Sequence, residues 1–276
     1  MFRVILSMFL TIILYFCKQK ESFHANTPFV RKDMTDTAAA TDLGATQPLF
    51  QREAEQTAVQ LTRYSADELA EMLHVNPQLA ALNKLRYARF LDPGPTLRAA
   101  WAYHGIAFKK LDAATMTAEQ MLFAERHLWI TSFLYGLLRP LNGIKNYRLE
   151  GNVRLPEYDD QTMFDFWKPR LTDVLIQSIL DDDGILLNLA SGEMKNLFDW
   201  KRIRKAVRII EPAFKVRKGD KLRTIVVYAK MCRGAMARHG IVQQAHNLDA
   251  LKAFEYEGFA YDEQESKGDL WMFTML

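Results

Sequence analysis

Short apolar runs rich in β-branched and aromatic residues most strongly limit what this chain can fold into. Their length and composition are typical of buried strands rather than helices. They occur at residues 10–15, 185–189, 206–210, 224–228 and 270–273. The sequence therefore predicts a sheet built from short strands that lie far apart along the chain.

Helices are expected between these strands. Helices are predicted at 51–62, 118–137, 162–180 and 230–239, with apolar residues at helical spacing most clearly in the first and third. Strands and helices do not alternate regularly, so we predict the α+β class, with a mixed sheet surrounded by helices. A chain of 276 residues that is 49% hydrophobic can bury one core of normal size, which favours a single compact domain.

The N-terminal run looks at first like a signal peptide, because Arg3 precedes an apolar stretch. Residues 14–16 are large where a cleavage site needs small ones, and the run is shorter than the roughly 20 residues that span a bilayer. We therefore expect a buried strand at 10–15 and no membrane segment. Met8 is an alternative start, which would make residues 1–7 an upstream extension; we place the domain itself at 9–276, with 1–8 as a possible extension.

Residues 65–90 predict two helices joined by a tight turn. Ser65 and Glu68 form a capping box that begins a helix at 66–73, and a turn at 75–77 leads into a second helix at 79–90. The second helix carries the basic residues Lys84, Arg86 and Arg89. The pair resembles a helix-hairpin-helix element, which binds DNA phosphates through backbone amides and basic side chains. Two helices that merely pack together explain the pattern equally well.

Charge is unevenly distributed. Residues 195–238 contain seven Lys and seven Arg against three acidic residues, although the whole chain has a net charge of only +3. Residues 247–269 contain seven acidic residues and two lysines. This pattern predicts either a surface with a positive field or a set of ordinary solvated faces.

Polar residues follow several of the predicted strands, where sites are common. If these segments converge, they form a pocket suited to phosphate or another anion, because guanidinium groups bind it bidentately. The basic candidates are Lys18, Arg139, Arg148, Lys230 and Arg233, and the other lining candidates are Glu150, Asn188, Ser191, Glu193 and Tyr228. Lys18, Lys230 and Glu193 are the candidate catalytic residues. The alternative is a buried network of ion pairs that fixes the loops.

No motif indicates a metal or cofactor site. The six histidines are scattered without ligand spacing, and the two cysteines, Cys17 and Cys232, cannot form a four-cysteine zinc site. P-loop, dinucleotide-binding and H-E-x-x-H motifs are absent from the sequence. Cys232 lies near basic residues that would lower its pKa, but we expect it to be buried and inert.

Several segments together resemble the YaaA family of bacterial peroxide stress proteins. Residues 134–141 read L-Y-G-L-L-R-P-L and residues 147–150 read Y-R-L-E. Residues 188–193 read N-L-A-S-G-E, and residues 228–236 read Y-A-K-M-C-R-G-A-M. The family usually opens with a strand ending in S-P-A-K; here Lys18 is kept while its neighbours differ.

The resemblance implies a cytoplasmic protein that limits free intracellular iron during peroxide stress and thereby protects DNA. It also implies a compact α+β fold with a positively charged cleft, a helix-hairpin-helix-like element and DNA binding, which we expect to be largely to phosphate and hence weakly sequence-specific. Lys84, Arg86, Arg89, Arg139, Arg148, Lys230 and Arg233 are the expected DNA or anion contacts. An enzyme acting on a small anionic substrate in the lysine-, arginine- and glutamate-lined pocket is the alternative, and neither hypothesis requires a cofactor.

Overall fold

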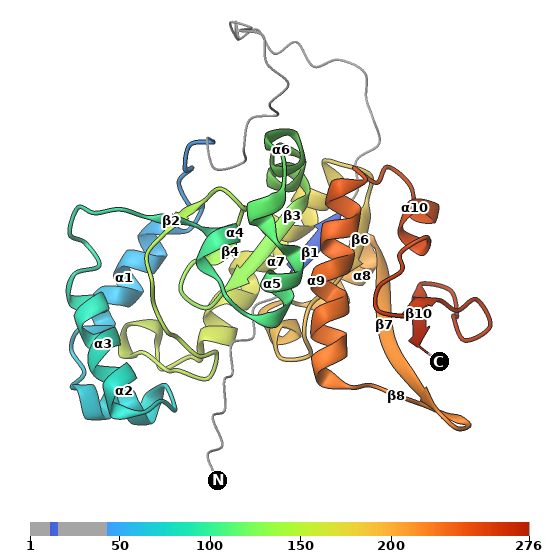
Figure 1. The fold of residues 1–276 in the computed structure, drawn as a ribbon. Helices are drawn as coiled ribbons and strands as arrows, with labels where there is room; N and C mark the ends of the chain where they lie inside the picture. The colour runs from blue at the N-terminus through green and yellow to red at the C-terminus, as the bar shows by residue number, and fades with distance from the viewer. Residues whose placement is uncertain (1–11, 16–42, 276) are drawn as a thin grey trace, which may run out of the picture.

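A mixed sheet forms the centre of the protein in a computed structural model, which describes residues 12–15 and 43–275 (Figure 1). The strand order is β4-β3-β1-β6-β7-β10-β9, and β8 pairs with β7 beside this path. The strands are β1 (Ile12–Tyr15), β3 (Leu128–Ser132), β4 (Gly136–Leu138), β6 (Ile185–Asn188), β7 (Arg208–Lys218), β8 (Lys221–Arg223), β9 (Ala260–Tyr261) and β10 (Leu270–Met275). A separate small ribbon pairs β2 (Leu97–Arg98) with β5 (Gly143–Ile144).

Strand directions in the sheet are mixed. β7 is parallel to both β6 and β10, whereas β1 is antiparallel to β3 and β6. The predicted strands at 10–15, 185–189 and 270–273 are confirmed within the described residues, and the α+β class is confirmed with them. The strand predicted at 206–210 begins at Arg208 and is much longer than expected.

Helices pack on this sheet and extend beyond it. They are α1 (Gln51–Leu61), α2 (Ala66–Met72), α3 (Pro77–Ala88), α4 (Ala99–Ala102), α5 (Ile106–Leu111), α6 (Ala118–His127), α7 (Met163–Leu180), α8 (Trp200–Ala206), α9 (Val226–Val242) and α10 (Leu248–Lys252). In Figure 1, α5 and α9 lie side by side in front of the sheet, and α9 contacts β1 and β7. The helix α7 contacts the strands β4 and β6. No helix among the described residues is long and apolar enough to cross a bilayer.

The helix predicted at 118–137 is confirmed as far as His127 and is wrong beyond it. α6 ends at His127, and the chain continues directly into β3 and then β4. β3 is rich in aromatic and β-branched residues and is buried throughout, because it pairs with β1 on one side and β4 on the other. Gly136 then adopts a φ of +69°, and a Cβ there would lie 2.8 Å from the Trp167 ring. Pairing with distant strands therefore overrides the helical pattern.

The strand predicted at 224–228 is also wrong, because α9 begins at Val226 and absorbs the helix predicted at 230–239. Val226 and Val227 are 62% and 50% exposed, so this apolar run is not a core strand. The buried residues Ala229, Cys232 and Met236 recur at helical spacing. Burial of these three residues along one face favours a helix, and the β-branched residues Val226 and Val227 occupy its exposed first turn.

The two helices predicted around residues 65–90 are confirmed as α2 and α3. The Ser65 hydroxyl accepts from the Glu68 N–H, and the Glu68 carboxylate accepts from the Ser65 N–H at 2.7 Å. Asn76 caps α3 through the Leu79 N–H, with Pro77 in its first turn. His74, in the turn between them, adopts a φ of +52°. Local capping signals thus determine both helix starts.

Candidate functional site

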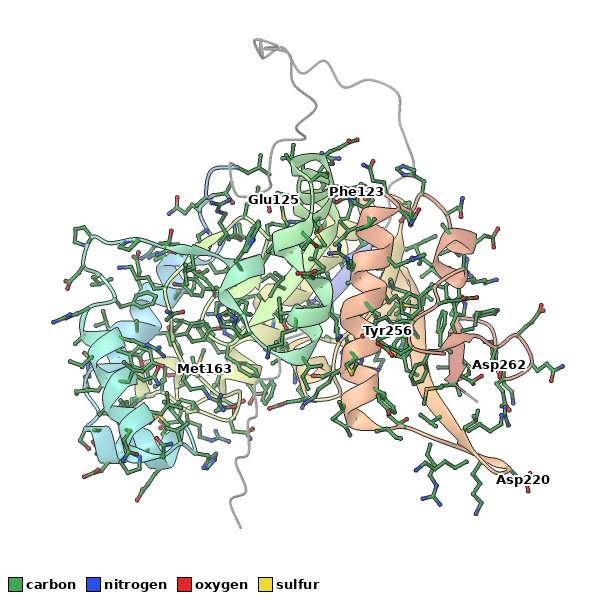
Figure 2. All side chains as sticks on the ribbon, in the orientation of Figure 1. Phe123, Glu125, Met163, Asp220, Tyr256 and Asp262 are labelled. Carbon is green, nitrogen blue, oxygen red and sulfur yellow. The ribbon has the colours of Figure 1, made fainter. Side chains whose placement is uncertain are left out.

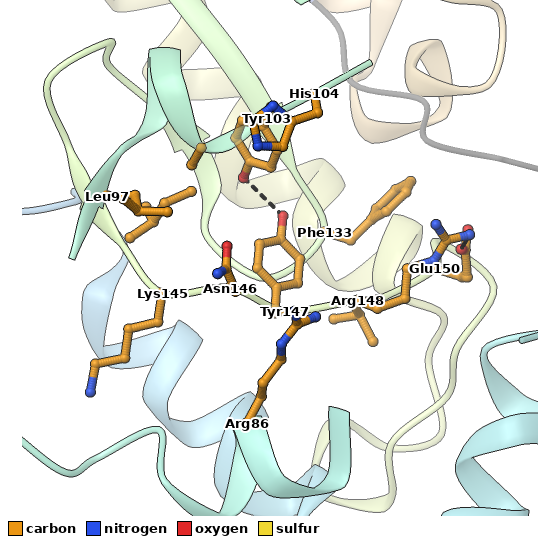
Figure 3. Close-up of a pocket in the computed structure, with 13 residues that line it drawn as sticks. Arg86, Leu97, Tyr103, His104, Phe133, Lys145, Asn146, Tyr147, Arg148 and Glu150 are labelled. Carbon is orange, nitrogen blue, oxygen red and sulfur yellow. Dashed lines mark hydrogen bonds and ion pairs between the residues drawn. The ribbon is translucent and has the colours of Figure 1, made fainter. Parts of the chain in front are cut away.

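Residues 144–150 line a cavity of about 400 Å³ together with α3 and the segment 97–104 (Figure 3). This volume lies in the usual range of small-molecule sites, about 300–1,000 Å³. The complete lining is Arg86, Leu97, Ala102, Tyr103, His104, Phe133 and residues 144–150. In Figure 3, Arg86 reaches from α3 toward the backbone of Tyr147, while Tyr103 and His104 lie on the opposite side.

A chain of hydroxyl groups fixes the aromatic wall of this cavity. Ser132 Oγ accepts from the backbone N–H groups of Leu134 and Tyr135, which leaves its own proton to donate to Tyr147 OH at 2.6 Å. Tyr147 OH and Tyr103 OH share a further hydrogen bond of 3.0 Å. Burial raises the pKa of Tyr147 and of Tyr103, so both phenols stay neutral at physiological pH. The wall is therefore rigid and uncharged.

Arg148 is the centre of a group of charged side chains beside the cavity. Its guanidinium forms an ion pair with Glu150 at 2.5 Å, and its backbone carbonyl accepts from Tyr87 OH. Burial raises the pKa of Glu150 and of Glu193, although Arg148 opposes this rise for both and Lys230 opposes it for Glu193. Three of the predicted segments thus meet here, because Glu193 interacts electrostatically with Arg148, Glu150 and Lys230.

Arg139 has a different environment. Its guanidinium carbon lies 3.4 Å from the centre of the Trp129 ring, and its N–H groups donate to the Arg126 carbonyl and to Ser178 Oγ. These contacts tie β4 to β3 and α7. The guanidinium of Arg139 therefore packs between β3, α6 and α7.

The basic residues of α3 are also separated. Lys84 donates to the Thr62 carbonyl at 2.6 Å and to the Tyr64 carbonyl, which holds the end of α1 against α3. Arg86 lines the cavity, and Arg89 is exposed at the end of α3. Of the three, Arg89 is thus the side chain exposed to solvent, as a contact with a DNA phosphate requires.

The remaining predicted residues lie on or beside the sheet. Asn188 Oδ1 accepts from the Ala190 N–H, and its amide donates to Glu211 at 3.3 Å. Tyr228 packs against Phe259, and Arg233 lies on α9, where burial lowers the pKa of its guanidinium. Ser191 follows β6, and its carbonyl accepts from the Lys195 N–H at 3.3 Å. Lys18, like Cys17 and Met8, lies outside the described residues, so its assignment stays a prediction.

The basic tract at 195–238 is partly neutralised by the acidic segment that follows it. Arg208 pairs with Asp269, and Arg217 pairs with Asp262 and Glu265. Farther along the β7–β8 hairpin, Lys218 and Lys221 are exposed and stand directly opposite each other. We call residues 215–223 the basic arm; it projects from the body of the protein in Figure 1, and Asp220 marks its tip in Figure 2.

Comparison with known protein families supports the resemblance read from the sequence. A family model described as peroxide stress protein YaaA matches residues 14–265. The chain belongs to this family. The match includes the cavity, the basic arm and every strand of the sheet from β3 to β9, and it ends before β10.

Curated relatives extend over nearly the same length. A protein of Phocaeicola vulgatus named UPF0246 protein is 47% identical over 246 residues, covering 89% of this chain and 96% of the relative. A UPF0246 protein of Bacteroides fragilis is 46% identical over 244 residues, covering 88% and 95%. One of Flavobacterium psychrophilum is 33% identical, covering 83% and 91%.

Sequence reasoning missed the residues that complete the cavity of this YaaA-family protein. Tyr103 and His104 come from the connection between α4 and α5, and Asn146 precedes the Y-R-L-E motif. Tyr147 belongs to that motif, but the motif alone does not place its ring in the cavity wall. The short sequence distance from the Y-R-L-E motif to Phe133 and the L-Y-G motif could have indicated that these residues share a wall. No sequence pattern near the Y-R-L-E motif connects it to Tyr103.

Proposed function

We propose that this protein acts in the peroxide stress response by binding DNA phosphates through the basic arm. The observation that carries the proposal is the Lys218–Lys221 pair, in which two like charges face each other across a hairpin. Like charges directly opposite each other on neighbouring strands are destabilising. A polyanion that lies across both ammonium groups would remove this repulsion.

The surroundings of the pair support the same partner. Residues 215–223 contain five basic residues and one acidic residue, and of these Lys218, Lys221 and Arg223 form no ion pair with any residue that the structure describes. The two strands are joined by Gly219 and Asp220, and Gly219 adopts a φ of +60°, which suits a tight hairpin. A two-stranded ribbon fits the major groove of B-DNA, which is about 12 Å wide.

The α2–α3 pair is proposed as a secondary contact. Lys84 is occupied by two carbonyl groups and Arg86 lines the cavity, which leaves Arg89 as the basic side chain offered to solvent. Binding dominated by phosphate contacts is weakly sequence-specific and strongly salt-dependent. We therefore expect the arm to supply most of the affinity.

We further propose that DNA binding contributes to protection against iron-dependent damage. Cationic side chains that neutralise phosphates release the cations condensed on DNA. Ferrous ions on the backbone would be released in the same way, so that less hydroxyl radical forms next to the bases. This proposal links the protection of DNA expected for the family to the charge of the arm by moving iron away from the backbone; it does not lower the amount of free iron, and it needs no iron ligands from the protein.

Fluorescence anisotropy with a labelled duplex tests the arm. The Lys218→Glu/Lys221→Glu variant keeps like charges opposite each other, so the hairpin is perturbed little, while its charge toward DNA is reversed. We expect the affinity to fall by about 10-fold or more, since two phosphate contacts are lost. The control is Arg52→Glu/Lys109→Glu, which makes the same charge change at exposed positions of α1 and α5. Equal weakening by both variants would refute a specific role for the arm.

A further inference from the structure

We propose that the cavity along residues 144–150 is a binding site for a nucleotide, with its phosphate near Arg86 and Arg148 and its base against the aromatic wall. The proposal does not depend on DNA binding by the basic arm. It rests on three features of the cavity: its charge, an unpartnered donor, and the combination of aromatic and polar groups in its lining.

The lining is positively charged. It contains Arg86, Lys145 and Arg148 against the single carboxylate of Glu150. Lys145 donates to the carbonyls of Phe90 and Asp92, which hold its ammonium group at the edge. Arg148 is neutralised by Glu150, whereas Arg86 forms no ion pair within the described part of the chain. An anionic ligand is therefore favoured over a neutral or cationic one.

Arg148 retains an unused donor. Its Nε–H is buried and has no hydrogen-bond partner among the described residues, although its terminal nitrogen is held by Glu150. Buried donors are nearly always satisfied, because an unpaired one costs about 1–3 kcal/mol. A phosphate oxygen that accepted from this group would remove the cost and would extend the interaction to the second cation of the site.

The rest of the lining suits a flat ring rather than an inorganic ion alone. Tyr103, Tyr147 and Phe133 provide aromatic surface, and the hydroxyl chain fixes both tyrosines. Asn146 and His104 are exposed at the rim, where they offer donors and acceptors for the polar edge of a base. Aromatic stacking contributes about 1–3 kcal/mol per base in nucleic-acid complexes.

Isothermal titration calorimetry of the full chain with dAMP, deoxyadenosine and inorganic phosphate tests the proposal. We expect dAMP to bind at least about 10-fold more tightly than either fragment, since only dAMP engages both the cations and the rings. Arg86→Met should weaken dAMP binding by about 10-fold or more. Leu97→Trp should obstruct the cavity, and this position tolerates change because Leu97 is 47% exposed.

Two further comparisons define the ligand and separate this proposal from the function of the arm. The Lys218→Glu/Lys221→Glu variant should bind dAMP like the wild type even if its DNA binding is lost. A single-stranded oligonucleotide that displaces dAMP would identify an unpaired DNA nucleotide as the source, and one that does not would identify a free nucleotide. The proposal is overturned if phosphate binds as tightly as dAMP, if dAMP produces no binding heat, or if Arg86→Met and Leu97→Trp both bind it normally.

Discussion

The buried imidazole of His127 should make the stability of this protein fall in mild acid. His127 lies at the end of α6 and is 2% exposed, and its Nδ1 contacts the Phe123 carbonyl at 2.7 Å. Burial lowers the pKa of His127 from 6.5 to about 4, even though the Asp182 carboxylate lies 3.6 Å from Nε2 and would favour the protonated form. The folded protein therefore keeps this side chain neutral at pH 5.

The size of the effect follows from proton linkage. In the unfolded chain His127 is protonated below about pH 6.5, whereas in the folded protein protonation waits until about pH 4. The stabilisation is present above pH 6.5 and is lost as the pH falls toward 4. Each pH unit in this window corresponds to about 1.4 kcal/mol, so the free energy of unfolding should fall by about 2 kcal/mol between pH 7 and pH 5.

Urea unfolding of the wild type and of His127→Gln at both pH values provides the measurement. Buried carboxyl groups with raised pKa values, Glu125 and Glu150, act in the opposite direction in this window, but they contribute equally to both proteins and cancel in the difference. We expect the wild type to lose about 2 kcal/mol more than the variant. His104→Gln, at an exposed histidine, should behave like the wild type. The same pH dependence in wild type and His127→Gln would refute the reasoning.

Two other predictions concern α9. A Cβ at Gly234 would lie 2.0 Å from the Ala107 carbonyl oxygen of α5, so Gly234→Ala should lower the free energy of unfolding by about 2–3 kcal/mol. Gly192→Ala is the control and should change this free energy little, because nothing lies within 4 Å of a Cβ at Gly192. Urea unfolding measures both variants, and equal stabilities would contradict the close packing of α9 against α5. Burial raises the pKa of Cys232 to about 12, so iodoacetamide at pH 8 should label Cys232 about 100-fold or more slowly in the folded protein than in urea. Mass spectrometry of the Cys232 peptide measures the labelling rate. Rapid labelling of the folded protein would show that the thiol is reactive.

Local signals in the sequence predicted the elements that they control. The capping box at Ser65 and Glu68 predicted the start of α2, since its contacts lie within a few residues, whereas α3 begins at Pro77, two residues earlier than predicted, because Asn76 caps it. β3 could not be recognised in the same way, because it follows α6 without a break and is stabilised by pairing with β1, more than 100 residues earlier. The prediction of a strand at 224–228, where α9 begins, failed for a related reason. The contacts of α9 with α5 outweigh the strand propensity of Val226 and Val227.

The site was predictable where one motif supplies it and not where segments meet. Arg148 and Glu150 are neighbours in sequence, and their pairing follows from the Y-R-L-E motif. The aromatic wall needs Tyr103 and Ser132 to meet Tyr147, which depends on the tertiary fold. The charge excess at 195–238 was visible, but only the pairing of Arg208 and Arg217 with the acidic segment shows which part of it remains available.

The salt dependence of duplex binding tests the central claim that the arm contacts DNA phosphates. The logarithm of the binding constant is measured against the logarithm of the KCl concentration for the wild type and for Lys218→Gln/Lys221→Gln. Each lost phosphate contact lowers the magnitude of the slope by about 0.9, so the variant should give a slope about 2 units shallower. Identical slopes for the two proteins would show that these lysines do not contact the DNA backbone.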